Sequence, residues 1–505
     1  MNESREMVRF LRSCGADKVT DEVGDRSEEG NLPIEVFEAA INNAQPGDTI
    51  MVRGGVYSCP RAIAINRSGE PGKPIYLMAA PGEVPVFDFS GTPGNTFFVT
   101  GSYWRLKGLV ITGGERALEL SGGEAHHNTL EQIRLHGGEA LAVYINDDAG
   151  YNIVLNCDAH HYFSMMRNGD GGDGIGVANN AGQGNVLIGN RAWNNADDGI
   201  DLWYAMRTVR VERCYSFYNG VNIWDFPFWL GNGNGFKLGA GEGRHVLVNC
   251  FAWGHKWGAG AGFTLNGNTS GLILHNCSAW DNRINFQFAS NYWRSIGVAQ
   301  EDCVLVNNAS LDGRSKDTID KRAESQCNSW DAALCVQVTD RDFVSLDDSA
   351  MTAPRNLDGS IPYNNFLRLA PRSAAIDKGT DVGMPFRGAR PDLGAFEHDP
   401  NEDGSCYVKM LHQAVRDHDI KKINKLIAAG EGINDKDWLG YTPLRWAVYF
   451  GYPDLIELLI SKGADPDIQS DTVRYALEIA RAMAYPELEA LLCKLGATAG
   501  DTSAN

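Results

Sequence analysis

An internal repeat between residues 104 and 310 constrains the fold of this chain more than any other feature. Eight segments align without gaps: "WRLKGLVI", "TLEQIRLH", "IVLNCDAH", "VLIGNRAW", "VRVERCYS", "HVLVNCFAW", "LILHNCSAW" and "CVLVNNAS". Each has a short β-branched run followed by small or polar residues, which predicts a strand and then a turn. The alignment places one residue of each repeat at an equivalent position: Gly108, Ile133, Cys157, Asn190, Cys214, Cys250, Cys277 and Asn307.

A second strand follows within five of the repeats. Its segments are "DGIGV" at 173, "DGIDL" at 198, "NGFKL" at 234, "AGFTL" at 261 and "INFQF" at 284. Alternation predicts that the apolar positions face inward: Ile175, Ile200, Phe236, Phe263 and Phe286, with Val177, Leu202, Leu238, Leu265 and Phe288. The residues between them should face outward: Gly176, Asp201, Lys237, Thr264 and Gln287.

These repeats are too short for βαβ units, and no helical period separates their strands. We therefore predict a mainly β fold, a right-handed parallel β-helix in which each repeat forms one coil and equivalent positions stack about 4.8 Å apart. The third and fifth intervals between repeats are longer than their neighbours, so their extra residues should bulge out as loops.

The chain divides into parts of different character. Residues 1–30 form a poorly defined tail, and 31–400 contain the β-helix, which opens with an amphipathic capping helix in "PIEVFEAAINNAQPGDTIMVRGGVY". Residues 405–500 contain three repeats with a period of 33, marked by Gly430, Gly463 and Gly496, and 501–505 form a second tail. The stretch "YTPLRWAVYFGYPDLIELLISKGADPDIQ" resembles an ankyrin repeat, which predicts a small all-α domain. Ankyrin stacks bind many kinds of protein, so this partner is not predicted.

The charge balance excludes some classes of partner. The formal net charge is -19, which argues against a nucleic-acid or anionic-membrane surface. The first thirty residues lack the apolar core of a secretory signal, and no stretch has the length of a membrane span. Eleven cysteines form no CxxC pair or zinc spacing, and Cys327 with Cys335 is the best candidate for a disulfide.

Two groups of stacked side chains have more than one interpretation. The cysteines at equivalent positions, Cys157, Cys214, Cys250 and Cys277, are either metal ligands or, as we expect, packed in the core. Three positions later comes a mostly aromatic file, which either packs against neighbouring coils or offers a platform for sugars: His160, Trp193, Phe217, Trp253 and Trp280.

The most informative cluster is acidic. In the β-helix register, Asp173, Asp197, Asp198 and Asp201 gather on one face, with Lys237 about one strand spacing away. Four carboxylates so close do not all ionise without a cation, and an oxygen-rich, sulfur-free site suits Ca²⁺. The alternative is that Asp occupies turns for local reasons and that Lys237 is a surface partner of Asp201.

These residues resemble a known family. "GDG" at 172–174, "ADDGID" at 196–201 and "GNGFKLG" at 233–239 are similar to the calcium and base motifs of family 9 polysaccharide lyases, pectate lyases built on a parallel β-helix. The resemblance covers about residues 31–398. It implies a calcium-dependent lyase that cleaves polygalacturonate or a related uronan, with Asp173, Asp197, Asp198 and Asp201 as calcium ligands and Lys237 as the base. Such a substrate implies extracellular or periplasmic action.

Two other functions stay open at this point. One is a β-helix glycoside hydrolase with Asp197 and Asp198 as acid and base and a histidine from "GHK" at 254–256. The other is a non-catalytic carbohydrate-binding or interaction protein. Three further residues are candidates for substrate binding near the acidic face: Trp203, Arg207 and Lys256.

Overall fold

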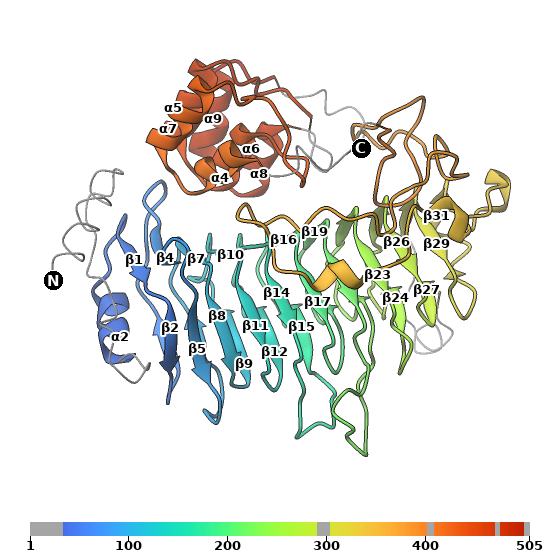
Figure 1. The fold of residues 1–505 in the computed structure, drawn as a ribbon, viewed down its shortest axis with the longest axis horizontal. Helices are drawn as coiled ribbons and strands as arrows, with labels where there is room; N and C mark the ends of the chain where they lie inside the picture. The colour runs from blue at the N-terminus through green and yellow to red at the C-terminus, as the bar shows by residue number, and fades with distance from the viewer. Residues whose placement is uncertain (1–33, 290–302, 401–408, 470–474, 499–505) are drawn as a thin grey trace.

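The computed structural model describes residues 34–289, 303–400, 409–469 and 475–498. Three parallel sheets run the length of a solenoid, and each coil adds one strand to each sheet (Figure 1). We call them sheets A, B and C, which begin with β1, β2 and β3. This arrangement confirms the predicted parallel β-helix.

Sheet A has the order β1 (Thr49–Val52), β4 (Ile75–Ala79), β7 (Trp104–Lys107), β10 (Thr129–Glu131), β13 (Ile153–Leu155), β16 (Val186–Ile188), β19 (Arg210–Glu212), β22 (Val246–Val248), β25 (Ile273–His275), β28 (Val304–Val306) and β31 (Glu324–Gln326). Sheet B has the order β2 (Gly55–Ser58), β5 (Pro85–Phe89), β8 (Val110–Gly113), β11 (Arg134–His136), β14 (Asp158–His160), β17 (Arg191–Trp193), β20 (Tyr215–Phe217), β23 (Phe251–Trp253), β26 (Ser278–Trp280) and β29 (Ala309–Leu311). Sheet C has the order β3 (Ile63–Ile65), β6 (Phe97–Val99), β9 (Arg116–Ser121), β12 (Leu141–Asn146), β15 (Asp173–Val177), β18 (Ile200–Asp201), β21 (Phe236–Lys237), β24 (Ala261–Thr264), β27 (Ile284–Phe288) and β30 (Thr318–Ile319).

A single left-handed residue turns the chain from sheet A to sheet B in eight successive coils, from β7–β8 to β28–β29. These residues have φ from 47° to 72°: Gly108, Gln132, Asn156, Gly189, Arg213, Asn249, Asn276 and Asn307. Most are Asn or Gly, the residues that enter this region at least cost. This turn corrects the predicted alignment at its two ends, because strand pairing puts Leu109 opposite Ile133 and Asn308 opposite Cys277. Gly108 and Asn307 are the turn residues one position earlier.

The predicted inward residues form the interior of the solenoid. Ile175, Phe236 and their equivalents are fully buried in one continuous apolar cluster, and the rings of Phe236 and Phe263 stack 4.7 Å apart. The cysteines at equivalent positions lie in the same cluster as free thiols, and Cys157 donates to the carbonyl oxygen of Leu130 one coil away. These cysteines are therefore packed core residues.

A capping helix, α2 (Ile34–Asn43), closes the first coil as predicted. Phe37 lies on its buried face, 4.7 Å from the ring of Phe87. The predicted disulfide is wrong, because Cys327 and Cys335 are both free. Cys335 is exposed after the short helix η1 (Ala332–Leu334). Cys327 is partly buried and packs against a second apolar cluster, which is formed by outward-facing residues of the sheets, by residues 343–395 and by the core of the C-terminal helices.

A strap of residues 331–398 lies over the outer face of sheet B from β14 to β29. It holds η1, η2 (Asp340–Asp342) and η3 (Ser349–Thr352). The aromatic file stacks beneath it: the Trp193 and Phe217 rings lie 5.5 Å apart, and Phe217 and Trp253 lie 4.3 Å apart. Phe366 of the strap lies 4.8 Å from Trp253, whose indole donates to Asp348. The file is thus buried packing and not a platform for sugars.

The C-terminal part folds as three helix pairs: α4 (Met410–Arg416) with α5 (Ile420–Ala428), α6 (Pro443–Tyr449) with α7 (Pro453–Ser461), and α8 (Ala476–Ala482) with α9 (Pro486–Lys494). Gly430, Gly463 and Gly496 follow the second helix of each pair with φ of 93°, 99° and 99°, which is the left-handed helix end that favours glycine. The pairs lie beside sheet A (Figure 1). None of the helices in the described ranges combines the length and the hydropathy that crossing a bilayer requires.

Candidate active site

The predicted site residues come from three neighbouring strands of sheet C. Asp173 begins β15, Asp201 ends β18 and Lys237 ends β21. Strand pairing places Gly176 opposite Asp201 and Asp201 opposite Lys237, as the repeat alignment predicted. Because neither the ankyrin repeats nor the strap lies over this part of sheet C (Figure 1), the site is on a free face of the solenoid.

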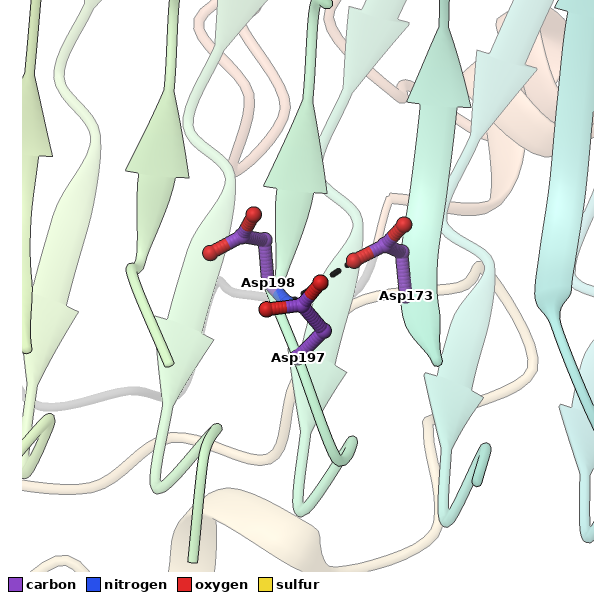
Figure 2. A group of neighbouring side chains, drawn as sticks. All are labelled: Asp173, Asp197 and Asp198. Atoms are coloured by element: carbon purple, nitrogen blue, oxygen red, sulfur yellow. Dashed lines mark hydrogen bonds between the residues drawn. The ribbon is translucent and has the colours of Figure 1, made fainter. Parts of the chain in front are cut away.

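Three carboxylates converge at this site. Oxygen atoms of Asp173, Asp197 and Asp198 all lie within 4.8 Å of one another, and all three side chains are buried (Figure 2). Asp197 and Asp198 lie in the turn before β18, where the chain is not bound to strand alternation, so both can turn toward Asp173. Asp201 is not in this group and lies instead against Lys237.

Backbone and amide donors fix the orientation of the carboxylates. Asp173 Oδ1 accepts from the Asp198 amide at 2.8 Å. Asp198 Oδ1 accepts from both the backbone amide and the side-chain amide of Asn234, each at 2.8 Å. Each aspartate is therefore tied to the next coil.

Asp197 joins the two long loops of the solenoid. Its Oδ2 accepts from the Gly171 amide at 2.7 Å, and its Oδ1 accepts from the Asn232 amide. The loops that carry these donors, 163–172 and 221–233, are the insertions predicted from the long repeat intervals. The insertions therefore help to hold the acidic cluster in place.

Lys237 forms ion pairs with the cluster. Its Nζ lies 2.9 Å from Asp198 Oδ2 and 3.2 Å from Asp201 Oδ2. The same Nζ lies 4.9 Å from the centre of the Trp203 ring, which is a cation–π contact.

Burial and mutual repulsion perturb the acids strongly. Burial, and then the charge of Asp198, raises the pKa of Asp197 to about 8. Burial raises the pKa of Asp201 to about 6, although Lys237 opposes the shift. Burial and the neighbouring aspartates raise the pKa of Asp173 well above its usual range. Burial lowers the pKa of Lys237, but the four surrounding aspartates outweigh it and the net shift is upward.

The donor set fits a hard divalent cation. It consists of carboxylate oxygens from adjacent coils, and no cysteine or histidine belongs to the converging group. A cation would offset the repulsion that raises the pKa values of the aspartates. Asp173, Asp197 and Asp198 are the residues that could hold it together, with Asp201 as the remaining carboxylate of the face.

The other predicted residues have different surroundings. Trp203 is half-buried beside Lys237, Arg207 is exposed, and Lys256 pairs with Asp281 of the next coil. His255 is fully buried, and its Nε2 lies 3.0 Å from the carbonyl oxygen of Ser216. This histidine belongs to the interior packing and does not reach the acidic face, which removes it from the hydrolase alternative.

Sequence reasoning missed several exposed apolar residues close to the site. Met166 and Phe228 lie on the two loops that contact Asp197, and Trp257 lies on the next turn, whose Gly258 and Gly260 approach Asn232. Apolar residues scattered in irregular loops have no periodicity, so the sequence does not mark them as residues near the site. Only the hydrogen bonds between these loops and Asp197, which the structure shows, place them there.

Comparisons with known proteins agree with this architecture. The family model "Pel9A-like, right handed beta helix region" matches residues 19–308, and the model "Ankyrin repeats (3 copies)" matches residues 393–470. Pectate lyase L of Dickeya chrysanthemi is 36% identical over 393 residues, which cover 74% of this chain and 88% of the relative.

Two solved structures share the fold. The crystal structure of pectate lyase Pel9A matches with a TM-score of 0.67 and 33% identity, over 77% of this chain and 98% of that one. A rhamnogalacturonan lyase matches with a TM-score of 0.57 and 26% identity, over 67% of this chain and 92% of that one. The chain belongs to the Pel9A-like right-handed β-helix family of polysaccharide lyases and carries C-terminal ankyrin repeats.

Proposed function

We propose that this lyase cleaves polygalacturonate, or a closely related uronan, by β-elimination, with Ca²⁺ bound by Asp173, Asp197, Asp198 and Asp201 and with Lys237 as the base. One observation carries the proposal: a largely but not fully buried amine, with its side chain 13% exposed, lies within 3.2 Å of two carboxylates, beside three converging carboxylates on a face of the β-helix. A hydrolase has no evident use for an amine at this position.

The reaction requires a base and a way to manage negative charge. Neutral Lys237 Nζ takes the C5 proton of a uronate, a C4=C5 double bond forms, and the C4–O bond to the leaving sugar breaks with its electron pair. When bound, Ca²⁺ offsets the substrate carboxylate and stabilises the enolate-like charge that develops on it. The leaving oxygen then gains a proton from solvent.

Lys237 must lose its proton before it can act. The aspartates hold the pKa of its ammonium group above the usual value. Neutralising those carboxylates with a divalent cation removes this cause, so the cation site would prepare the base as well as the substrate. We therefore expect an alkaline rate optimum.

Asp197 and its two loops place the substrate beside the amine in this scheme. The amides of Gly171 and Asn232 hold the carboxylate, so the loop walls and the acidic cluster form one rigid unit. Trp203, next to the amine, is positioned to contact the reacting sugar, while Arg207 and Lys256 are candidates for binding more distant carboxylates.

Product formation on polygalacturonate tests the proposal. Elimination leaves an unsaturated sugar end that absorbs ultraviolet light, whereas hydrolysis produces reducing ends without that absorbance. We expect the rate of absorbance increase to rise with Ca²⁺, to fall at least about 100-fold with a chelator, and to return when Ca²⁺ but not Mg²⁺ is restored.

A rhamnogalacturonan backbone serves as the second substrate, since a neighbour in fold is a rhamnogalacturonan lyase. Reducing ends without absorbance, or full activity in chelator, would contradict the proposal.

A further inference from the structure

We propose that the ankyrin repeats of this chain recognise its own β-helix, and that the two parts form one cooperative folding unit in which the repeats are not an adaptor for a second protein. The proposal is independent of the lyase chemistry. It rests on how the repeats contact the outer face of sheet A.

The contacts recur with the period of the ankyrin repeat. The turn between the two helices of each pair faces sheet A, and Asp417, Phe450 and Met483 lie at equivalent positions in it, 33 residues apart. Asp417 pairs with Lys107, the Phe450 ring lies 3.6 Å from the Arg105 guanidinium, and the Met483 carbonyl oxygen lies 2.9 Å from His127 Nε2. All three repeats therefore use one surface, and that surface is occupied.

Residues two positions further along these turns make a second row of contacts. Tyr452 and Tyr485 occupy this position in the second and third repeats. The Tyr452 hydroxyl lies 2.7 Å from the hydroxyl of Tyr76, and the Tyr485 ring lies 5.0 Å from the His127 ring. These contacts extend the interface over β4, β7 and the turn before β10.

Buried charges are matched in both directions across the interface. Arg416 Nε lies 3.1 Å from Glu131 Oε1, and its Nη2 donates to the carbonyl oxygen of Asp358 in the strap at 2.6 Å. Both charged side chains are less than 5% exposed. Further along, the Tyr441 hydroxyl donates to Glu212 of β19. In the first pair the acid, Glu131, is on the sheet and the base, Arg416, is on the repeats. In the second pair the base, Lys107, is on the sheet and the acid, Asp417, is on the repeats. The two opposite pairs favour one orientation of the repeats on the sheet.

Apolar packing joins the same surfaces. Ile153, Leu155, Val186 and Ile188, which project outward from β13 and β16, belong to the same buried cluster as the ankyrin core. Leu439 and Trp438 approach the backbone of Gly189 so closely that a Cβ there would lie 3.1 Å from each. Separating the ankyrin repeats from sheet A would expose this apolar surface to water. Its burial therefore stabilises the association in addition to the charge pairs.

Cutting the folded full-length chain tests the proposal. A specific protease site is inserted between residues 400 and 409, the folded protein is cut to completion, and the nicked protein is run on size exclusion at nanomolar concentration. We expect the two fragments to elute together. A variant with Arg105→Ala and Glu131→Gln should then show about 30-fold weaker association, whereas Lys425→Ala with Glu457→Gln on the outer helices should not.

A charge exchange keeps the test interpretable if a variant folds poorly. Lys107→Asp should weaken association of the fragments, and Lys107→Asp combined with Asp417→Lys should restore at least part of it. Separation of the wild-type fragments, or association unchanged in the Arg105 and Glu131 variant, would overturn the proposal and leave the ankyrin surface to an external partner.

Discussion

At the scale of single residues, the raised pKa values of the acidic cluster would make the proposed cation binding depend on pH. Asp197 and Asp201 have pKa values raised to about 8 and about 6, so both retain protons at a pH where a free carboxylate has none. A cation binds the ionised form, and its binding must release these protons.

We therefore predict that the affinity for Ca²⁺ rises from pH 6 to pH 9, by up to about tenfold per pH unit for each proton released. Titration calorimetry at pH 7 in buffers of different ionisation enthalpy should show proton release. An affinity that is constant over this range, without proton release, would argue against cation binding by these carboxylates.

The same shifts set the stability of the cation-free protein. An acid whose pKa is higher in the folded state binds more protons there, so its contribution to stability is greatest at low pH and is lost as pH rises from about 4 to about 8. Stabilisation by Ca²⁺, measured as the rise in Tm over chelator, should accordingly be larger at pH 8 than at pH 6.

Two buried arginines provide a second residue-scale contrast. Arg445 in α6 is 1% exposed, and none of its three guanidinium nitrogens has a hydrogen-bond partner among the residues that the structure describes. Arg416 in α4 is equally buried but bonds to Glu131, Asp358 and Gln413. A buried donor without a hydrogen bond among the described residues is costly even when carboxylates such as Glu212 and Glu478 lie near, whereas breaking a buried pair leaves its partner uncompensated.

Arg445→Met should therefore raise the free energy of unfolding by about 1 kcal/mol, while Arg416→Met should lower it by about 3 kcal/mol. Chemical denaturation of both variants measures the difference. A loss of stability in Arg445→Met as large as that in Arg416→Met would mean that the nearby carboxylates of Glu212 and Glu478 compensate the Arg445 charge fully, and would contradict this prediction.

At the scale of secondary-structure elements, the aromatic file on sheet B is a packing device. Trp253 is fully buried between Phe217 and the strap residue Phe366. We predict that Trp253→Ala lowers the free energy of unfolding by about 3 to 5 kcal/mol and leaves the KM for polysaccharide unchanged.

The matched control for that variant is Trp257→Ala, since Trp257 is 58% exposed. Its effect on stability should stay within about 0.5 kcal/mol. Chemical unfolding of the two variants measures the contribution of each side chain to stability, and initial rates give the KM for polysaccharide. Together they separate a packing role of Trp253 from a sugar-binding role. A raised KM in a stably folded Trp253→Ala would restore the interpretation of the file as a sugar platform.

Most of the strands of the β-helix, and the side chains that face its interior, could be predicted because the sequence repeat determines them. Alternation of apolar residues gave the inward face of sheet C and placed Lys237 opposite Asp201. The register was wrong by one residue at Gly108 and Asn307, because a left-handed turn residue there resembles the small residues that follow it in other coils. Local composition cannot distinguish adjacent small residues on a tight turn.

At the scale of the whole molecule, two of the three faces of the solenoid are covered along part of their length. The ankyrin repeats lie over sheet A from β4 to β19, and the strap lies over sheet B from β14 to β29, so sheet C is the face that neither of them covers (Figure 1). The sequence did not predict this cover, because Arg105, Glu131, Glu212 and Arg416 read as ordinary surface charges until their partners across 200 or more residues are known.

In the proposed mechanism, Lys237 removes the proton beside a cation held by the aspartates. The most direct measurement is ultraviolet product formation by Lys237→Ala on polygalacturonate with Ca²⁺, with Ca²⁺ binding measured on the same sample. We predict a loss of activity of at least about 1,000-fold with Ca²⁺ binding retained. Turnover close to that of the wild type, with the cation bound, would contradict the assignment of Lys237 as the base.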